Sequence, residues 1–473
     1  MMKKNKLSLM AAAAATVVLL TGCVNLAPEH QRPDAPVAPQ WPQGPRAEAA
    51  DAKAATELQW RQFFRDERLT QLIDLALKNN RDLRIALLNV DVARAQANVT
   101  AASRWPTVNA GLSASRGPQT TSNGDSRIVN SYQAGLQITS YEIDLFSRVK
   151  NQSAASFAQY LATGEAARSA QISLIAGVAS AYLAVQADDE LLALTRQTLA
   201  TREDSLKLMQ LKFDNGAASN LDLSTAKSSY EAARATLAQA ERTRQQDLNA
   251  LTLLVGQAVP DSLPQSRPLS DQTMGALLAG VPSQVLVGRP DVVQAEQQLV
   301  AAEANIGVAR AAYFPSITLT SSVGTASSAL RDLFSQSAWS IAGSALMPIF
   351  DAGRVSNNVA AAKANREIAI AQYEKTVQTA FREVADALAG RATLDEQLRA
   401  QDAQAAAEAT RLELVDLSFR NGAASSLDLL DAQRATFAAQ QAALQVLLAQ
   451  LQNQVQLYKV LGGGLDAPRQ NGS

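Results

Sequence analysis

The sequence has very few of the side chains that build metal sites, disulfides and nucleophilic dyads. It contains one histidine, His30, and one cysteine, Cys23. A zinc site with two histidines, a Cys-x-x-Cys pair and an internal disulfide are therefore excluded. A Gly-Lys dipeptide is also missing, so there is no P-loop, and there is no Gly-x-Ser-x-Gly nucleophile elbow. We therefore expect neither an enzyme nor a bound cofactor.

The chain also lacks an excess of either charge. It has 43 basic and 44 acidic residues, for a formal net charge of −1. Because no positive field is available to attract phosphates, no nucleic acid partner is expected. Aromatic residues make up only 5% of the chain, and its mean hydropathy of −0.08 is typical of a soluble protein. At 473 residues, the length alone favours roughly three domains of about 150 residues.

The N-terminus carries a targeting signal. Lys3, Lys4 and Lys6 precede an apolar run that ends at Leu20, followed by Thr21-Gly22-Cys23. This pattern predicts a secretory signal peptide over residues 1–22, because the run is too short for a retained membrane helix. Leu20-Thr21-Gly22-Cys23 resembles the bacterial lipobox, which implies cleavage before Cys23 and lipid, palmitate included, on Cys23. Val24-Asn25 lacks the aspartate that resembles an inner-membrane retention signal, so the outer membrane is expected. The alternative is a stray apolar tail with a buried cysteine.

A proline-rich stretch follows the predicted lipid anchor. Six prolines lie between residues 28 and 45, which predicts an extended, lipidated tether over residues 23–60 with no packed core. His30 lies within this stretch. We interpret it as a solvated residue with no ligand role.

The rest of the chain is a tandem duplication. Phe213-Asp214-Asn215-Gly216-Ala217-Ala218-Ser219 recurs as Phe419-Arg420-Asn421-Gly422-Ala423-Ala424-Ser425, an offset of 206 positions, and Leu-Asp-Leu follows in both copies. Self-similarity at one offset indicates repeated structural units. The predicted division is repeat 1 over 61–258, a proline-rich connector over 259–282, repeat 2 over 283–462 and a C-terminal tail over 463–473.

Each repeat begins with a helix followed by a predicted β-hairpin. The first helix spans about 66–104, and its counterpart begins after Pro290. Alternating apolar residues then predict strands, in hairpins at about 106–141 and 315–348. The loops are expected around Gly117-Pro118, Asn123-Gly124 and residues 324–328. Strands of about 10 residues suit a membrane β-barrel. Eight aromatic residues are expected at strand ends, as in membrane girdles: Trp105, Tyr132, Tyr141, Phe146, Tyr313, Phe314, Trp339 and Phe350.

An ordinary pair of soluble hairpins is the alternative. In a membrane, however, four strands cannot close a barrel, because lipid does not tolerate an open edge. A barrel must then be shared between chains, with eight strands from two copies or twelve from three. The pattern itself does not choose between these numbers.

Long helix pairs complete each repeat. Proline-free runs predict helices at about 151–214 and 354–420, which end at Asn215-Gly216 and Asn421-Gly422 because Asn and Gly accept the left-handed cap conformation. Return helices are predicted at about 221–255 and 427–461. A spacing of seven residues predicts coiled-coil packing through one row of apolar side chains: Leu430, Phe437, Leu444, Leu451 and Tyr458.

Taken together, these features resemble the outer membrane factors, the TolC-like channels, and in particular the lipoprotein branch that serves resistance-nodulation-division efflux pumps. The resemblance rests on the lipobox, the duplication and several short motifs: Arg81-Asp82-Leu83, Arg289-Pro290-Asp291, Ala311-Ala312-Tyr313-Phe314-Pro315-Ser316-Ile317, Glu383-Val384-Ala385-Asp386-Ala387-Leu388 and Leu461-Gly462-Gly463-Gly464.

The resemblance implies a mainly α fold with membrane β-strands. It implies a homotrimer with a shared 12-stranded barrel in the outer membrane and a coiled-coil tunnel in the periplasm. The implied partners are a periplasmic adaptor, an inner-membrane resistance-nodulation-division transporter and outer-membrane lipid. The implied function is a passive exit duct for drugs and other toxic small molecules.

The resemblance also implies a periplasmic gate formed by Leu427 and Asp431, with Arg434 as an ion-pair partner of Asp431. Repeat 1 has Thr225 and Ser228 at the positions of Asp431 and Arg434, so the gate is expected to differ between the repeats. The adaptor is expected to dock on the helix tips at Asn215, Gly216, Asn421 and Gly422. Two alternatives stay open: a type I secretion exit channel, and a structural coiled-coil lipoprotein that spans the periplasm.

Overall fold

The computed structural model describes residues 24–42, 53–55, 58–120, 124–278 and 286–464. Cys23, the predicted signal peptide and most of the C-terminal tail lie outside these residues. The chain divides into two compact units. Unit 1 contains residues 1–34, 89–164 and 294–374, and unit 2 contains residues 35–88, 165–293 and 375–473.

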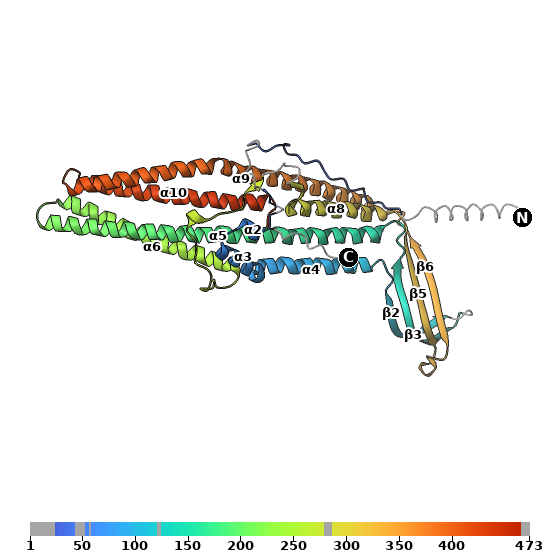
Figure 1. The fold of residues 1–473 in the computed structure, drawn as a ribbon. Coiled ribbons are helices and arrows are strands. Elements are labelled where there is room, and N and C mark those ends of the chain that lie inside the picture. Colours follow the sequence, from blue (N-terminus) through green and yellow to red (C-terminus); the bar gives the residue numbers. More distant parts are fainter. Residues whose placement is uncertain (1–23, 43–52, 56–57, 121–123, 279–285, 465–473) are drawn as a thin grey trace. The chain divides into compact units, whose positions relative to one another are not determined.

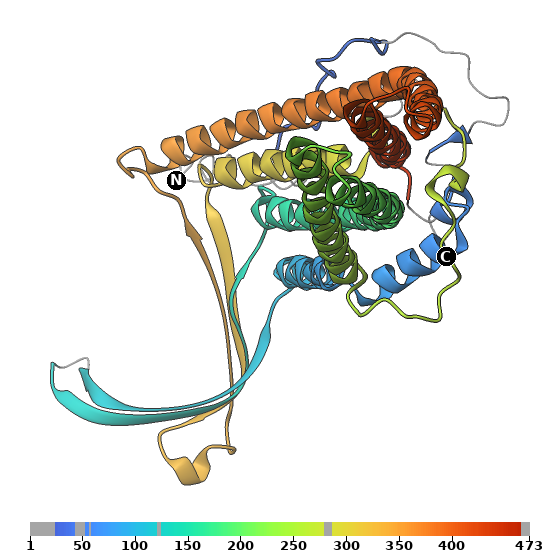
Figure 2. The same ribbon diagram turned by 90° about the vertical axis from the view of Figure 1, so that its left-hand side faces the viewer.

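Unit 1 contains a four-stranded antiparallel sheet. Its strands are β2 (Val108–Thr120), β3 (Ser126–Glu142), β5 (Ser316–Ser327) and β6 (Ser337–Leu346), and their order is β2-β3-β5-β6 (Figure 1). A short 3-10 turn, Leu330–Asp332, lies between β5 and β6. Figure 2 shows the β2–β3 hairpin curving away from β5 and β6 toward its tip. The predicted pair of hairpins is confirmed, and the structure joins them into one sheet through β3 and β5.

The predicted strand ends were wrong on the loop side. Gly117 and Pro118 lie within β2, paired with Val129 and Ile128, and Gly324 lies within β5, paired with Ala338. Within one chain β2 has a single neighbouring strand, so the missing N–H of Pro118 breaks no hydrogen bond to a second strand of the same copy. Three strands are consequently longer than the predicted 10 residues, with 13, 17 and 12 residues in β2, β3 and β5.

The two longest helices have equal lengths. α5 (Arg148–Asp214) and α9 (Arg354–Arg420) each contain 67 residues, which corresponds to about 100 Å at 1.5 Å per residue. The return helices are α6 (Asn220–Val255) and α10 (Ser426–Val460). These four helices agree with the prediction to within a few residues. In unit 1 an alanine cluster packs α5 against α8 (Pro290–Ala311), and its buried members are Ala155, Ala158, Ala301 and Ala304.

The predicted first helix is two helices. α3 (Glu67–Asn79) ends at Asn80, and α4 (Arg81–Ala102) begins directly after it. The Asn80 backbone is extended, and its side-chain oxygen accepts a hydrogen bond from the Leu83 N–H at 2.9 Å. Its amide also donates to the Leu254 carbonyl at 2.9 Å. Asn80 thus caps the start of α4 and binds α6. These contacts interrupt the predicted helix although neither proline nor glycine is present at the break.

Unit 2 has an aromatic core near the C-terminal end of α10. Phe63, from the short helix α2 (Trp60–Phe63), stacks on Tyr458 with ring centroids 4.1 Å apart. The Tyr458 hydroxyl donates to the Leu58 carbonyl at 2.6 Å. Parallel strands β1 (Lys53–Ala54) and β4 (Leu277–Leu278) pair in the same unit. Residues that were predicted to belong to the tether or connector thus contribute to this core region.

The predicted heptad row is buried over only part of its length. Leu451 and Tyr458 are buried, but Leu430, Phe437 and Leu444 are half-buried. In the first half of α10 the buried positions are mostly small or polar. Gln433 accepts a hydrogen bond from Arg202 of α5, and Thr436 donates to the Glu408 carbonyl of α9 at 3.0 Å. Polar contacts thus occupy this part of the interface, and Leu430 and Phe437 of the apolar row line a cavity instead.

One helix, α5, contains a segment long and apolar enough to cross a membrane, but 61% of that segment is buried in the protein. Burial to this extent also fits the core helix of a folded protein, so we do not assign α5 to the membrane.

His30 is exposed, as expected for a solvated residue, but it also contacts two glutamates. His30 Nδ1 lies 2.8 Å from Glu303 Oε2, and Nε2 lies 3.5 Å from Glu296 Oε1. Arg32 binds Glu296 through two hydrogen bonds of 2.8 Å. Both glutamates lie on α8 in unit 1. The proline-rich segment is therefore fastened to α8 by charged contacts that sequence spacing does not reveal.

Candidate channel wall and gate

The two faces of the sheet in unit 1 differ in chemistry. The side chains on one face are mainly apolar and exposed. Residues that pair across the strands on this face include Leu136 with Val323 and Val323 with Trp339. The opposite face carries small and polar residues, with hydroxyl pairs between Thr318 and Ser344 at 2.6 Å and between Ser322 and Ser340 at 2.8 Å. An apolar face and a polar face on the same exposed strands are typical of a membrane barrel with a wet interior.

Both outer strands of this sheet have a free edge. In the part of the chain that the structure describes, β2 pairs only with β3, and β6 pairs only with β5. A row of unpaired backbone groups cannot remain in hydrocarbon. Both faces of the sheet thus suit a membrane barrel, but the backbone groups along its two edges lack hydrogen-bond partners among the described residues.

The aromatic residues cluster mainly at the end of the sheet nearest the helices. Phe146 stacks on Phe314 with centroids 4.5 Å apart, and Trp105 and Phe350 are exposed. Tyr132 departs from the prediction because it lies inside β3. It is, however, the residue at which the pairing of β3 with β5 begins, opposite Ser327, so it marks the end of the four-stranded part of the sheet.

The two predicted helix tips have the same hydrogen-bond pattern. Gly216 and Gly422 have φ angles of +69° and +76°. The Asn215 amide donates to the Leu211 carbonyl at 2.7 Å, and that of Asn421 donates to Leu417 at 2.8 Å. Each following helix begins with a capping box, Ser219 with Asp222 and Ser425 with Asp428. The shared sequence motif therefore produces the same turn at both helix tips.

The tips also contact each other within unit 2. The Lys212 ammonium lies 4.4 Å from the centre of the Phe419 ring. The Ser426 hydroxyl donates to Asp222 Oδ1 at 3.2 Å. Figure 1 shows the α5–α6 turn beside the α9–α10 turn. The pair of tips therefore presents one joined surface.

The structure brings the three predicted gate residues to one side of α10. Leu427 is 67% exposed, so it is not a core residue of this chain. Arg434 Nη2 lies 2.7 Å from Asp431 Oδ1, and Arg411 Nη1 lies 3.4 Å from Asp431 Oδ2. The expected ion pair between Asp431 and Arg434 is present. Arg411, on α9, is a second partner that no sequence pattern indicates.

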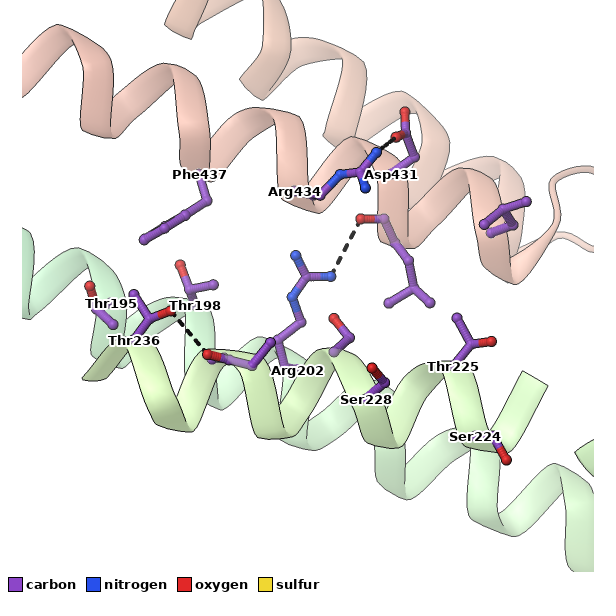
Figure 3. Close-up of a pocket in the computed structure, with 15 residues that line it drawn as sticks. Thr195, Thr198, Arg202, Ser224, Thr225, Ser228, Thr236, Asp431, Arg434 and Phe437 are labelled. Carbon is purple, nitrogen blue, oxygen red and sulfur yellow. Dashed lines mark hydrogen bonds and ion pairs between the residues drawn. The ribbon is translucent and has the colours of Figure 1, made fainter. Parts of the chain in front are cut away.

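A cavity of about 620 Å³ lies between α5, α6 and α10 in unit 2 (Figure 3). Leu427, Asp431 and Arg434 line it on one side, and Thr225 and Ser228, the repeat counterparts of Asp431 and Arg434, line it on the other. Repeat-related positions therefore face each other across one space. The predicted difference between the repeats is therefore a difference between two walls of the cavity. One wall is charged, and the opposite wall carries neutral hydroxyls.

Arg202 is a residue of this cavity that sequence reasoning missed. It is only 5% exposed, and its Nη1 donates to Gln433 Oε1 at 2.5 Å and to the Leu430 carbonyl at 3.4 Å. Burial, and then the charge of Arg434, lower the pKa of the Arg202 guanidinium. An arginine among many on a long helix carries no local signal of such a role.

A carboxylate pair lies elsewhere in unit 2. Burial, and then the neighbouring Asp247 and Asp189 carboxylates, raise the pKa of Asp188 to about 7. Asp188 Oδ2 is buried and accepts no hydrogen bond from the described residues. Asp189 instead forms an ion pair with Arg244. No sequence pattern marks these residues as a site.

Two of the short family motifs meet in the structure. Arg289 Nη2 lies 2.6 Å from Asp291 Oδ2 and 2.8 Å from Glu383 Oε2. Arg289 Nη1 also donates to the Val460 carbonyl at the end of α10, at 2.9 Å. These contacts stabilise the start of α8 and the end of α10, so the motifs have a structural role in unit 2.

The comparisons with known proteins agree with this geometry. Residues 72–257 and 281–463 match the model of the outer membrane efflux protein family. The chain is 44% identical to the probable efflux pump outer membrane protein TtgC of Pseudomonas putida, over 98% of this chain and 96% of that one. It is 42% identical to outer membrane protein OprJ of Pseudomonas aeruginosa, over 97% of this chain and 96% of that one.

Solved structures give the same result. The open state of the Neisseria gonorrhoeae MtrE outer membrane channel has a TM-score of 0.85 and 38% identity, over 93% of this chain and 98% of that one. A membrane protein of Pseudomonas aeruginosa has a TM-score of 0.85 and 40% identity, over 92% and 100%. With this fold, and with repeats that match one model twice, the chain belongs to the outer membrane efflux protein family.

Proposed function

We propose that this chain is the outer-membrane exit duct of a tripartite efflux pump and that it acts as a homotrimer. The observation that carries the proposal is the two-faced sheet with two free edges. Three copies would pair β6 of one copy with β2 of the next and close a 12-stranded barrel. Every edge group would then be satisfied, with the apolar face toward lipid and the hydroxyl-rich face toward water.

The helices would continue the barrel as a tunnel in the periplasm. Three copies would contribute twelve helices from α5, α6, α9 and α10. In this assembly Leu427, Asp431 and Arg434 would narrow the tunnel near the tips. Three apolar side chains that meet on an axis exclude water, and three carboxylates favour cations unless they are paired. The pairing of Asp431 with Arg434 and Arg411 supports a closed state held by ion pairs.

The helix tips are the proposed docking site for a periplasmic adaptor. Asn215-Gly216 and Asn421-Gly422 form matching turns, so a trimer would present six similar turns in a ring. An adaptor with repeated subunits could then use the same surface at every turn. Energy would come from an inner-membrane transporter of the resistance-nodulation-division class, because the chain itself carries no nucleotide-binding motif.

The proposed substrates are drugs and other toxic small molecules, as the names of the efflux relatives suggest. Two alternatives have less support. A structural spacer has no use for a two-faced membrane sheet. A type I secretion channel has the same architecture, but the relatives named here are efflux proteins.

The experiment that tests the proposal combines mass and conductance. The purified full chain in detergent should have the mass of three copies by native mass spectrometry, and it should form cation-conducting channels in planar bilayers. Cells that lack the gene should accumulate an efflux dye and should recover when it is restored. A monomer without channel activity would refute the exit duct.

A further inference from the structure

The cavity beside the gate has the chemistry of an anion site. Its charged lining residues are Arg202, Asp431 and Arg434, so positive charge exceeds negative charge. Asp431 is already paired with Arg434 and Arg411. Arg202 forms no ion pair with any residue in the described part of the chain. A guanidinium so deeply buried without a counter-ion is unfavourable, because its charge has lost most of its hydration.

The hydroxyls around Arg202 fall into two groups. Four threonine hydroxyls in the lining donate to carbonyls of their own helices and so have no proton left to offer: Thr195, Thr198, Thr225 and Thr236. Three serines, Ser224, Ser228 and Ser229, line the α6 side, and their hydroxyls make no hydrogen bond to the described residues. They are therefore available as donors.

Figure 3 shows the Arg202 side chain reaching from α5 into the space between α6 and α10, with Ser228 and Arg434 on opposite sides of it. Only Nη1 of its guanidinium is used, toward Gln433 and the Leu430 carbonyl. The remaining N–H groups, the serine hydroxyls and the Arg434 guanidinium surround the same volume. Tetrahedral oxyanions are bound by such combinations of guanidinium and hydroxyl donors.

We propose that this cavity binds a small oxyanion, of the size and charge of inorganic phosphate or sulfate, with Arg202 as its principal ligand and Ser224, Ser228 and Ser229 as hydrogen-bond donors. The site lies in unit 2 of one chain, and the side of its lining that carries Asp431 and Arg434 also belongs to the gate proposed above. The bound anion would supply a counter-charge to the buried Arg202 guanidinium.

The test is isothermal titration calorimetry on the detergent-solubilised full chain at constant ionic strength. Inorganic phosphate and sulfate should each bind saturably, one per chain, whereas chloride at the same ionic strength should not. The variant Arg202→Gln should lose binding at least on the order of tenfold, as expected for the loss of a charged hydrogen-bond donor. The matched control is Arg399→Gln, because Arg399 is an exposed arginine that pairs with Glu396 on α9; it should bind as the unchanged chain does.

Because Arg202 is buried, its replacement can impair folding, so a second variant is needed. The double variant Ser224→Ala with Ser228→Ala changes two exposed residues and should weaken phosphate binding severalfold while the melting temperature stays the same. The proposal is overturned if neither anion binds saturably, or if Arg202→Gln and Arg399→Gln bind alike. A carboxylate from a neighbouring copy on Arg202, seen by electron cryo-microscopy of the assembly, would also overturn it.

Discussion

His30 Nδ1 lies 2.8 Å from Oε2 of Glu303, a glutamate on α8 whose side chain is only 3% exposed. Arg366 Nε reaches the other oxygen of the same carboxylate at 3.3 Å. The N-terminal segment also donates Val24 N–H to the Leu145 carbonyl and accepts a bond from Arg310 at Leu26. The lone histidine is therefore part of a clasp that holds residues 24–34 on unit 1.

Loss of this clasp should free the segment. We expect His30→Ala to raise the rate of cleavage after Glu29 by glutamyl endopeptidase severalfold, because the segment then loses its contact with Glu303. Mass spectrometry of the fragments measures the rate. Glu29→Gln in the same background should abolish the new fragment. Equal cleavage rates with and without His30 would mean that the clasp adds no stability.

Removal of the gate ion pairs should open the tunnel. Asp431→Ala with Arg434→Ala should raise the closed-state conductance of single channels in planar bilayers, because the proposed tunnel constriction loses its ion pairs. The matched control is Asp416→Ala with Arg420→Ala, an exposed pair at a spacing of four residues on α9, which should leave conductance unchanged. If both double variants conduct like the unchanged chain, the gate assignment fails.

Stability should depend on pH through Asp188. Its pKa in the folded chain is about 7, against an ordinary value of 3.8, so the folded state binds the proton more tightly than the unfolded state does. Stability should therefore fall as pH rises from about 4 to about 7. Asp188→Asn should flatten this slope and raise the melting temperature at pH 8, measured by differential scanning calorimetry. The neighbouring variant Asp189→Asn should keep most of the slope, since Asp189 raises the pKa of Asp188 less than burial and Asp247 do.

The tip glycines should be needed for their backbone conformation. Added Cβ atoms at Gly216 and Gly422 would meet nothing within 4 Å, so only the positive φ angles oppose substitution. Gly422→Ala should destabilise the chain by about 1 kcal/mol. Gly164→Ala is the matched control, because its site in α5 is equally open without a positive φ; it should stabilise the helix by ~0.5–1 kcal/mol. Urea unfolding measures both, and a neutral Gly422→Ala would contradict the argument.

The lipid on Cys23 should be dispensable for assembly. Cys23→Ser should abolish labelling by radioactive palmitate, because serine offers no thiol to the lipid-transferring enzyme. We still expect trimers by native mass spectrometry, since the proposed barrel holds the chain in the membrane without the lipid. Retention of the label would refute the lipobox, and loss of trimers would show that the anchor is required for assembly.

The helices were the most predictable part of this fold. Long proline-free runs and Asn-Gly stops predicted α5 and α9 to within a few residues, because local propensity and capping decide where a helix ends. The strand ends were less predictable. Pro118 is a strand breaker in most settings, but here it lies within β2, two residues before the strand ends and with a single neighbouring strand in this chain.

The gate and its cavity were only partly predictable, because some of their contacts are local in sequence and others are not. The pairing of Asp431 with Arg434 follows from a spacing of three residues on one helix, so the sequence could suggest it. Arg202 meets Gln433, and His30 meets Glu303, across more than two hundred residues. No local pattern marks such contacts, because the fold of the whole chain brings them together.

The free edges of β2 and β6 have a consequence for biogenesis. A single copy that entered the bilayer alone would expose two rows of unpaired peptide groups to hydrocarbon, so membrane insertion and association of the copies have to be one concerted event. The rate of maturation should then rise more steeply than linearly with the amount of newly exported chain. A damaged copy that lacks one strand edge would block the closure of otherwise intact partners, which makes edge defects genetically dominant.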